Sequence, residues 1–291
     1  MTTIAVTAAT GPLGRLVVAA LLDRGVAAES IIAAVRSPEK AADLAAQGVQ
    51  VRRADYAEPD TLVPALQGAE RVLLISGTPG NRMAEHANVI EAAKEVGVEL
   101  LAYTGILNSD TTTMLLAADH KATEQLIKES GLPYAFLRNG WYTENSLMEL
   151  ETTLEHGFAG ATGGGRFTPA ARADFAAAAA AVLTDHADAT NVAYELGGDE
   201  AVTMDEVAEI LGEVTGRTIA NTDMPAEQYA GVLVQAGLPE PVAQVLADAS
   251  AAIGRGELAT GSGDLQRLIG RPSTPVKTTF QQALAAKETT T

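Results

Sequence analysis

The residues most suited to chemistry lie in a turn near the start of the chain, between an apolar run and a segment with helical spacing. The turn reads Thr7-Ala8-Ala9-Thr10-Gly11-Pro12-Leu13-Gly14. Gly11 would let the backbone approach a pyrophosphate, and Gly14 would let the helix pack close to the strand. Free N–H groups and the helix dipole favour an anion at this helix N-terminus. The spacing predicts a dinucleotide phosphate loop, with a purely structural turn as the alternative.

One glycine of the dinucleotide fingerprint is missing from this turn. Its place falls on Ala9 in the G-x-G-x-x-G spacing and on Ala8 in the wider G-x-x-G-x-x-G spacing. Both registers stay open at the level of the sequence.

A second indication comes from the end of the next apolar run. A site for NAD would place an Asp or Glu there to hold the ribose 2′-hydroxyl, but this chain has Arg36 and no carboxylate. A guanidinium suits a 2′-phosphate, and Lys40 would add to it. The sequence therefore predicts NADPH over NADH. The alternative is that Ser37 and Pro38 cap a helix while Arg36 is solvated.

The tyrosines exclude the usual alcohol–ketone mechanism, in which a lysine four residues after a tyrosine lowers the pKa of the phenol. None of the six tyrosines has a lysine at that spacing; the residues found there are Asp60, Leu107, Arg138, Ser146, Gly198 and Leu233. Quinones and cationic conjugated dyes accept hydride without a dedicated proton donor, so they fit a site in which the cofactor supplies the chemistry.

Other catalytic arrangements also find no support. The four histidines have no metal-ligand spacing and are interpreted as packing or surface residues: His86, His120, His156 and His186. No Gly-x-Ser-x-Gly motif occurs, and the absence of cysteine excludes a thiolate nucleophile or a zinc–thiolate site. We expect no bound metal.

The elements that must position these residues alternate between strand and helix. Apolar or β-branched runs predict strands over residues 4–7, 31–35, 49–52, 71–75, 100–103 and 134–137. Helical spacing covers residues 13–22, 41–47, 83–96 and 117–130 between them. The pattern is typical of an α/β fold, a Rossmann-like doubly wound parallel sheet.

After about residue 140 the alternation weakens. We expect a flexible glycine-rich stretch over 157–165, helices over 172–183, 225–237 and 241–253, a strand over 194–196, and a capping box at Thr203–Glu206. The predicted domains are an NAD(P)-binding Rossmann domain over 1–150 and a smaller, mostly helical substrate lobe over 151–291, with segments interleaved at the sheet edge.

Composition bounds the partners. With 20 Lys and Arg against 37 Asp and Glu, the 291-residue chain carries a net charge of −17, which argues against nucleic acid. No apolar run reaches membrane-spanning length, and the N-terminus has no basic region typical of a signal peptide. We expect a cytoplasmic protein with a small-molecule substrate, and a homodimer is one alternative for its oligomeric state.

Several motifs in this order resemble the NmrA-like atypical short-chain dehydrogenases. The match is closest to the bacterial NAD(P)H:quinone oxidoreductases of type 2, with triphenylmethane reductase a near relative. The motifs are Thr10-Gly11-Pro12-Leu13-Gly14, Val35-Arg36, Ala54-Asp55-Tyr56, Leu74-Ile75-Ser76, Ala102-Tyr103-Thr104, Leu137-Arg138-Asn139-Gly140-Trp141-Tyr142 and residues 168–176.

The resemblance implies roles for individual residues. For the cofactor these are Ala8, Thr10, Gly11, Pro12 and Leu13 at the pyrophosphate, Arg36 at the 2′-phosphate, Asp55 near the adenine, Ile75, Ser76 and Gly77 along its middle, and Asn139, Gly140, Trp141, Tyr142, Thr143 and Glu144 at the nicotinamide end. His86, Tyr103 and Tyr142 are implied for the quinone pocket, with packing roles as the alternative. Two positions depart from the family: Ala8 replaces a glycine, and Gly105 replaces a serine.

We therefore expect an NADPH-dependent reductase that transfers hydride to a quinone or a similar conjugated electrophile. The alternative is a non-enzymatic NmrA-like sensor that binds NADP and acts through a protein partner, because the acidic chain is unsuited to direct contact with DNA.

Overall fold

The computed structural model describes residues 2–77, 80–185 and 190–288. Its main sheet has seven strands in the order β3-β2-β1-β4-β5-β6-β8, and the paired strands from β3 to β6 are parallel. The strands are β1 (Ile4–Thr7), β2 (Ile31–Val35), β3 (Gln50–Arg53), β4 (Arg71–Leu74), β5 (Leu100–Ile106), β6 (Tyr134–Asn139) and β8 (Val192–Leu196). The strand order reverses between β1 and β4, as in Rossmann folds.

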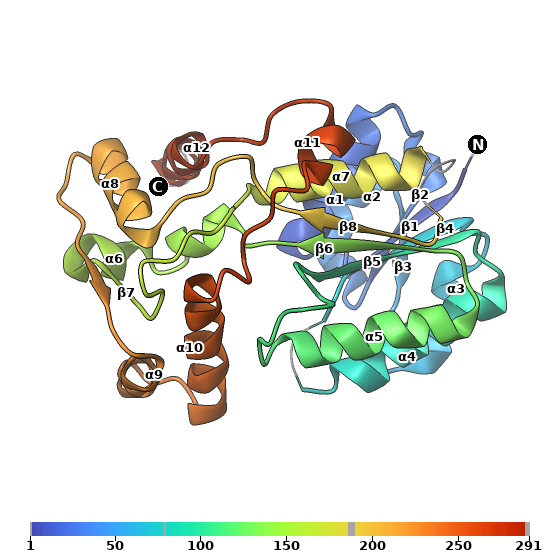
Figure 1. Cartoon of the computed structure of the whole chain (residues 1–291). Helices are drawn as coiled ribbons and strands as arrows, with labels where there is room; N and C mark the ends of the chain where they lie inside the picture. Colours follow the sequence, from blue (N-terminus) through green and yellow to red (C-terminus); the bar gives the residue numbers. More distant parts are fainter. Residues whose placement is uncertain (1, 78–79, 186–189, 289–291) are drawn as a thin grey trace. The chain divides into compact units, whose positions relative to one another are not determined.

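Helices cover both faces of this sheet (Figure 1). They are α1 (Pro12–Asp23), α2 (Ala42–Ala46), α3 (Leu62–Leu66), α4 (Arg82–Val96), α5 (Ala117–Ser130) and α7 (Arg172–Thr184). Every residue of β1, β2 and β4 is buried, as expected when both faces of a parallel sheet are covered. The predicted α/β class is confirmed.

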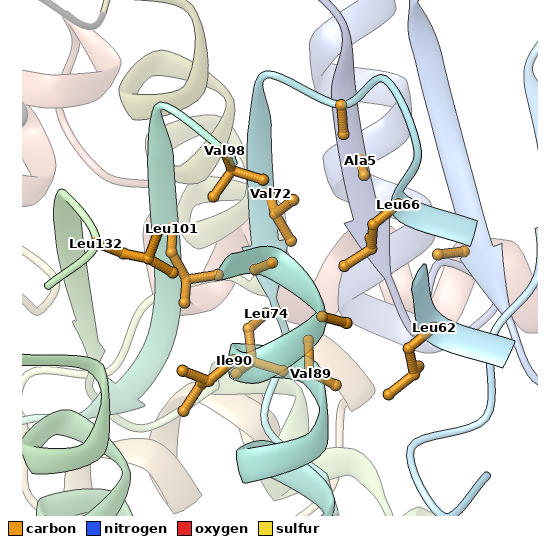
Figure 2. Packing of buried hydrophobic residues seen from close by; sticks show 14 of the residues in the cluster. Ala5, Leu62, Leu66, Val72, Leu74, Val89, Ile90, Val98, Leu101 and Leu132 are labelled. Carbon is orange, nitrogen blue, oxygen red and sulfur yellow. The ribbon is translucent and has the colours of Figure 1, made fainter. Parts of the chain in front are cut away.

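Figure 2 shows the core on one face of the sheet. Side chains of β4 and β5, such as Val72, Leu74 and Leu101, pack against Val89 and Ile90 of α4. Burial of apolar surface stabilises this layer by about 25 cal/mol per Å². The layer fixes α4 and α5 against the strand ends that carry the candidate site.

Two compact units alternate along the chain. The first comprises Met1–Ile106, Asp119–Asn139 and Ala173–Tyr194, and the second Leu107–Ala118, Gly140–Arg172 and Glu195–Thr291. The second contains α6 (Leu150–His156), β7 (Phe158–Gly160), α8 (Met204–Thr215), β9 (Asn221–Asp223), α9 (Ala226–Gln235), α10 (Glu240–Gly254), α11 (Asp264–Ile269) and α12 (Val276–Glu288). The boundary at residue 150 stays a prediction.

The glycine-rich stretch over 157–165 has more structure than its composition indicates. Phe158–Gly160 pairs with β9 as a parallel two-stranded sheet, and the amides of Thr162 and Gly163 donate to the Asp223 carboxylate. The expectation of a flexible stretch is therefore wrong, because residues about 60 positions later supply its hydrogen bonds.

The capping box that opens α8 is confirmed. Thr203 Oγ1 accepts from the Glu206 amide, and the Glu206 carboxylate accepts from the Thr203 amide. Within the part of the chain that the structure describes, no helix is long and apolar enough to cross a membrane.

Candidate functional site: a dinucleotide crevice

The carboxyl ends of β1 and β4 flank the point where the strand order reverses. Open α/β sheets bind ligands in the crevice outside such a point. Here that point lies between the loop after Thr7 and the segment after Leu74, both in the first unit. The sequence placed two of its predicted cofactor segments in these loops.

The loop after β1 resolves the register of the missing glycine. Ala8 has φ of +48°, a left-handed conformation that favours glycine, and its carbonyl accepts from the Gly11 amide at 2.9 Å. The spacing is therefore G-x-x-G-x-x-G with Ala8 in the first position. Holding an alanine in this conformation costs roughly 1–2 kcal/mol.

Gly14 lets α1 lie against this loop. A Cβ at Gly14 would lie 2.4 Å from the Ala8 carbonyl oxygen and 2.7 Å from Ala9 Cα. At Gly11 a Cβ would lie 3.2 Å from the same oxygen. Glycine at these two positions therefore lets the helix and the loop lie close together.

The N-terminus of α1 can receive an anion. Gly11 is its N-cap, no side chain caps the helix, and no acidic residue lies in the first turn. The first N–H groups of a helix have no intrahelical partners, and the dipole there favours negative charge. The loop after β1 and the N-terminus of α1 therefore fit a pyrophosphate.

Arg36 lies just beyond β2 with its side chain exposed. Among the described residues it has no ion pair, whereas Arg15 pairs with Asp43 and Arg53 with Glu58. Arg36 thus keeps its charge and hydrogen-bond donors for a ligand, as a 2′-phosphate contact requires. Arg36 and Lys40 stay predictions as contacts of that group.

Asp55 follows β3 in a tight turn. Its Oδ1 accepts from the Ala57 amide at 3.0 Å, and its own amide donates to Thr61 Oγ1 at 2.9 Å. The carboxylate thus stabilises the turn, and its position near the adenine stays a prediction.

The segment after β4 is held by hydrogen bonds to its backbone. The amide of Ile75 donates to Thr7 Oγ1 at 3.0 Å, and its carbonyl accepts from Tyr56 Oη at 2.9 Å. The amide of Ser76 donates to Thr104 Oγ1 at 2.8 Å. Side chains from three other strands or loops therefore fix the backbone of Ile75 and Ser76.

Gly77 follows Ser76 in the segment after β4. Its amide donates to His86 Nε2 at 3.0 Å, and its carbonyl accepts from Arg82 Nε at 2.9 Å. His86, Tyr103 and His120 stack edge to face or tilted beside it, with centroids 5.5 Å apart for His86 and Tyr103.

Burial governs the protonation of this cluster. Desolvation, followed by the charge of Arg82, lowers the pKa of His86 to about 4 and that of His120 to about 3. Burial raises the pKa of Tyr103. Both histidines are therefore neutral at pH 7. His86 and Tyr103 have no exposed surface, and their place in a quinone pocket stays a prediction.

Residues 139–144 span the division between the units, and Asn139, at the end of β6, is buried. In the second unit the Gly140 amide donates to the Leu196 carbonyl, and the Thr143 amide donates to that of Ala170. The Glu144 carboxylate accepts from the amide of Arg172.

The two aromatic residues of this segment differ in their contacts. The Trp141 carbonyl accepts from the Ala170 amide at 3.0 Å. The Arg172 guanidinium lies over the Tyr142 ring, 4.8 Å from its centroid. The fold orders this segment, and its cofactor and pocket roles stay predictions.

Gly105 lies beside a buried ion pair. Arg138 donates to both carboxylate oxygens of Glu124 at 2.9 and 2.7 Å, and both side chains are only 4% exposed. A Cβ at Gly105 would lie 3.2 Å from Glu124 Oε1. A side chain at this position would therefore crowd the carboxylate.

Sequence patterns missed part of this arrangement. Arg82 and Thr123 were not singled out, although the spacing of Arg82 and His86 places both on one helix face. No cluster of histidine and acidic residues in the described ranges could hold a metal. His186 lies outside those ranges.

Comparison with known proteins decides the family. The model of a family described as NAD(P)H-binding matches residues 8–186. The chain belongs to this NAD(P)H-binding family. Quinone oxidoreductase 2 of Escherichia coli is 44% identical over 93% of this chain and 95% of its own length.

Solved structures agree. The NADPH complex of the E. coli quinone oxidoreductase matches with a TM-score of 0.92 at 42% identity, covering 97% of this chain and all of the other. Citrobacter triphenylmethane reductase in complex with NADP(H) matches with a TM-score of 0.89 at 42% identity over the same shares. The Rossmann-like fold and the resemblance to these reductases are confirmed.

Proposed function

We propose that this chain transfers hydride from NADPH to a quinone or a similar conjugated electrophile, without a Tyr–Lys pair. The observation that carries this proposal is 44% identity to a quinone oxidoreductase over nearly the whole chain. NADPH as the cofactor and an enzyme of the quinone-reductase type, both expected from the sequence, are confirmed by these relatives.

The loop after β1 supports binding of the pyrophosphate. Ala8, Thr10, Gly11, Pro12 and Leu13 would surround it, because the N-terminus of α1 has no side-chain cap and no acidic residue in its first turn. Arg36 would hold the 2′-phosphate with donors that no described residue occupies, and Asp55 would lie near the adenine.

The remaining cofactor contacts are proposed by position. Ile75, Ser76 and Gly77 would line the middle of the dinucleotide, because their backbone is fixed at the end of β4. Residues 139–144 would lie at the nicotinamide end, with Tyr142 in the substrate pocket.

The bound cofactor supplies the hydride, so the chain's residues bind, orient and exclude water. A quinone or dye that accepts hydride takes up any proton it needs from water. Hydride transfer with proton uptake from water requires no general acid at the site, in keeping with the absence of a lysine four residues after any tyrosine.

A panel assay tests the function. Oxidation of NADPH is followed with simple quinones and a cationic triphenylmethane dye, and NADH is run in parallel. We expect turnover with at least one acceptor and a higher kcat/KM with NADPH. Tight NADP binding without turnover of any acceptor would contradict the proposal and favour the sensor function.

The net charge of the chain indicates which partners suit it. A net charge of −17 suits small-molecule chemistry and disfavours nucleic acid. A cytoplasmic location and a homodimer stay predictions, which cell fractionation and analytical ultracentrifugation test.

A further inference from the structure

The backbone N–H and C=O of Gly77, which belong to two consecutive peptide groups, are both held by side chains from a single helix. His86 Nε2 accepts from its amide at 3.0 Å, and Arg82 Nε donates to its carbonyl at 2.9 Å. Arg82 and His86 lie four residues apart on α4, hence on one face of that helix.

Residues of α5 set the orientation of the His86 ring. Because His86 Nε2 accepts a hydrogen bond from the Gly77 amide, the ring proton is on Nδ1, which donates to Thr123 Oγ1 at 2.9 Å. Thr123 in turn donates to the Asp119 carbonyl at 2.8 Å. Only one neutral tautomer of His86 satisfies these contacts.

Donor and acceptor roles can be assigned in the same way for the side chains that hold the Gly77 carbonyl. Arg82 Nη1 can only donate, so His120 Nε2 accepts at 3.2 Å and His120 Nδ1 donates to Tyr103 Oη at 2.7 Å. Arg82, His86, His120, Thr123 and Tyr103 are all at most 4% exposed. Two chains of hydrogen bonds thus run from the backbone N–H and C=O of Gly77 to α5 and β5.

We infer that His86 and Arg82 are positioning residues for NADPH, acting through the backbone of Gly77. Gly77 lies in the segment after β4, beside the point where the strand order reverses, and open α/β sheets bind ligands at such a point. The inference rests on the proposed function. Buried polar networks are costly unless every member is satisfied, and a satisfied one fixes a single geometry.

The inference differs from the role in the quinone pocket. His86 has both ring nitrogens engaged by protein groups and no exposed surface. A positioning role predicts a change in the affinity for NADPH, whereas a pocket role predicts a change in the KM for quinone.

The decisive comparison is His86→Leu against His86→Gln. Leucine cannot accept from the Gly77 amide, and leaving a buried donor unpaired corresponds to about a tenfold weaker Kd for NADPH. Glutamine offers an oxygen to the same amide, so its Kd should stay within about threefold of wild type. The KM for quinone should not change in either variant.

Val89→Ala is the matched control for general destabilisation. Val89 lies on α4, is fully buried and belongs to the apolar core rather than to the hydrogen-bond network. We expect it to lower the melting temperature while the Kd for NADPH stays at the wild-type value. Thr123→Val keeps the side-chain volume and removes the acceptor for His86 Nδ1. It should weaken NADPH binding about threefold, and it decides the matter if His86→Leu does not fold.

Unchanged NADPH affinity in His86→Leu and Thr123→Val would overturn the inference. So would a raised KM for quinone with unchanged affinity for NADPH. In either case the wild-type protein still binds NADPH and reduces quinone, so the proposed function survives. A wild-type protein that binds no NADPH would overturn both proposals.

Discussion

Replacing Gly14 by alanine tests the phosphate cradle most sharply. The added Cβ would lie 2.4 Å from the Ala8 carbonyl oxygen, 2.7 Å from Ala9 Cα and 3.0 Å from the Ala8 carbonyl carbon. All three neighbours are backbone atoms, so no side chain can rotate away. Helix α1 and the loop must separate by about 1 Å to restore ordinary contact.

This displacement sets the expected magnitudes. Overpacking a compact site costs about 1–3 kcal/mol, and the upper end applies because backbone must move. A misplacement of about 1 Å at a binding constellation costs about a hundredfold. We expect Gly14→Ala to lower the free energy of unfolding by about 3 kcal/mol and to weaken NADPH binding about a hundredfold.

Calorimetric titration with NADPH and urea unfolding measure the two effects. Gly231→Ala is the control, because a Cβ there meets nothing within 4 Å and replacing a helical glycine stabilises by about 0.5–1 kcal/mol. Wild-type affinity for NADPH in Gly14→Ala would refute the assignment of this loop to the pyrophosphate.

Three further predictions concern charge. Arg36→Ala should weaken NADPH binding about 10- to 100-fold with NADH binding and melting temperature unchanged, and an unchanged Kd for NADPH would contradict the 2′-phosphate assignment. The pKa of His86 falls from 6.5 to about 4 in the folded state, so the unfolded chain binds more protons between these values and stability drops as pH falls through that window, by roughly 3 kcal/mol. Urea unfolding at pH 7 and 4.5 should show a shallower drop for His86→Gln but not for the exposed His156→Gln. Glu124→Gln should destabilise by about 3–5 kcal/mol because it leaves Arg138 charged in the interior; a loss below about 1 kcal/mol by urea unfolding would contradict this.

The sequence predicted the sheet well where strands are continuous apolar runs. The runs at Ile4–Thr7 and Ile31–Val35 match β1 and β2, because both faces of these strands are covered and need apolar residues. Strand β5 continues to Ile106, beyond its predicted end at 103. Its last residues, which include Gly105, pair with β6. Such pairing depends on the neighbouring strand and leaves no local signal.

Short elements escaped prediction for the same reason. Helix α3 has five residues, and β7 exists only because β9 supplies its hydrogen bonds. The helix predicted over 41–47 is confirmed as α2, but the 3-10 turn over Pro38–Ala41 that precedes it was not predicted. Proline at the start fixes φ and removes a donor, which favours the tighter turn.

The residues of the candidate site were also predicted only in part. The loop from Ala8 to Gly14 was predicted because its spacing is local, but only the backbone shows that Ala8 takes the glycine conformation. The network around Gly77 joins α4, α5 and β5, and the contacts to α5 and β5 link residues 17 to 38 positions apart. Pairing of this kind follows from topology, so the helical spacing of Arg82 and His86 did not show which partners they have.

Transfer of an isotope label tests directly whether hydride passes from NADPH to the acceptor. NADPH carrying two deuterium atoms at the reactive carbon of its nicotinamide is incubated with the protein and a cationic triphenylmethane dye, and the colourless product is analysed by mass spectrometry. We predict one deuterium on the central carbon of the dye, at a rate that depends on the enzyme. A product without the label, or no reduction of the dye or of any quinone, would contradict it.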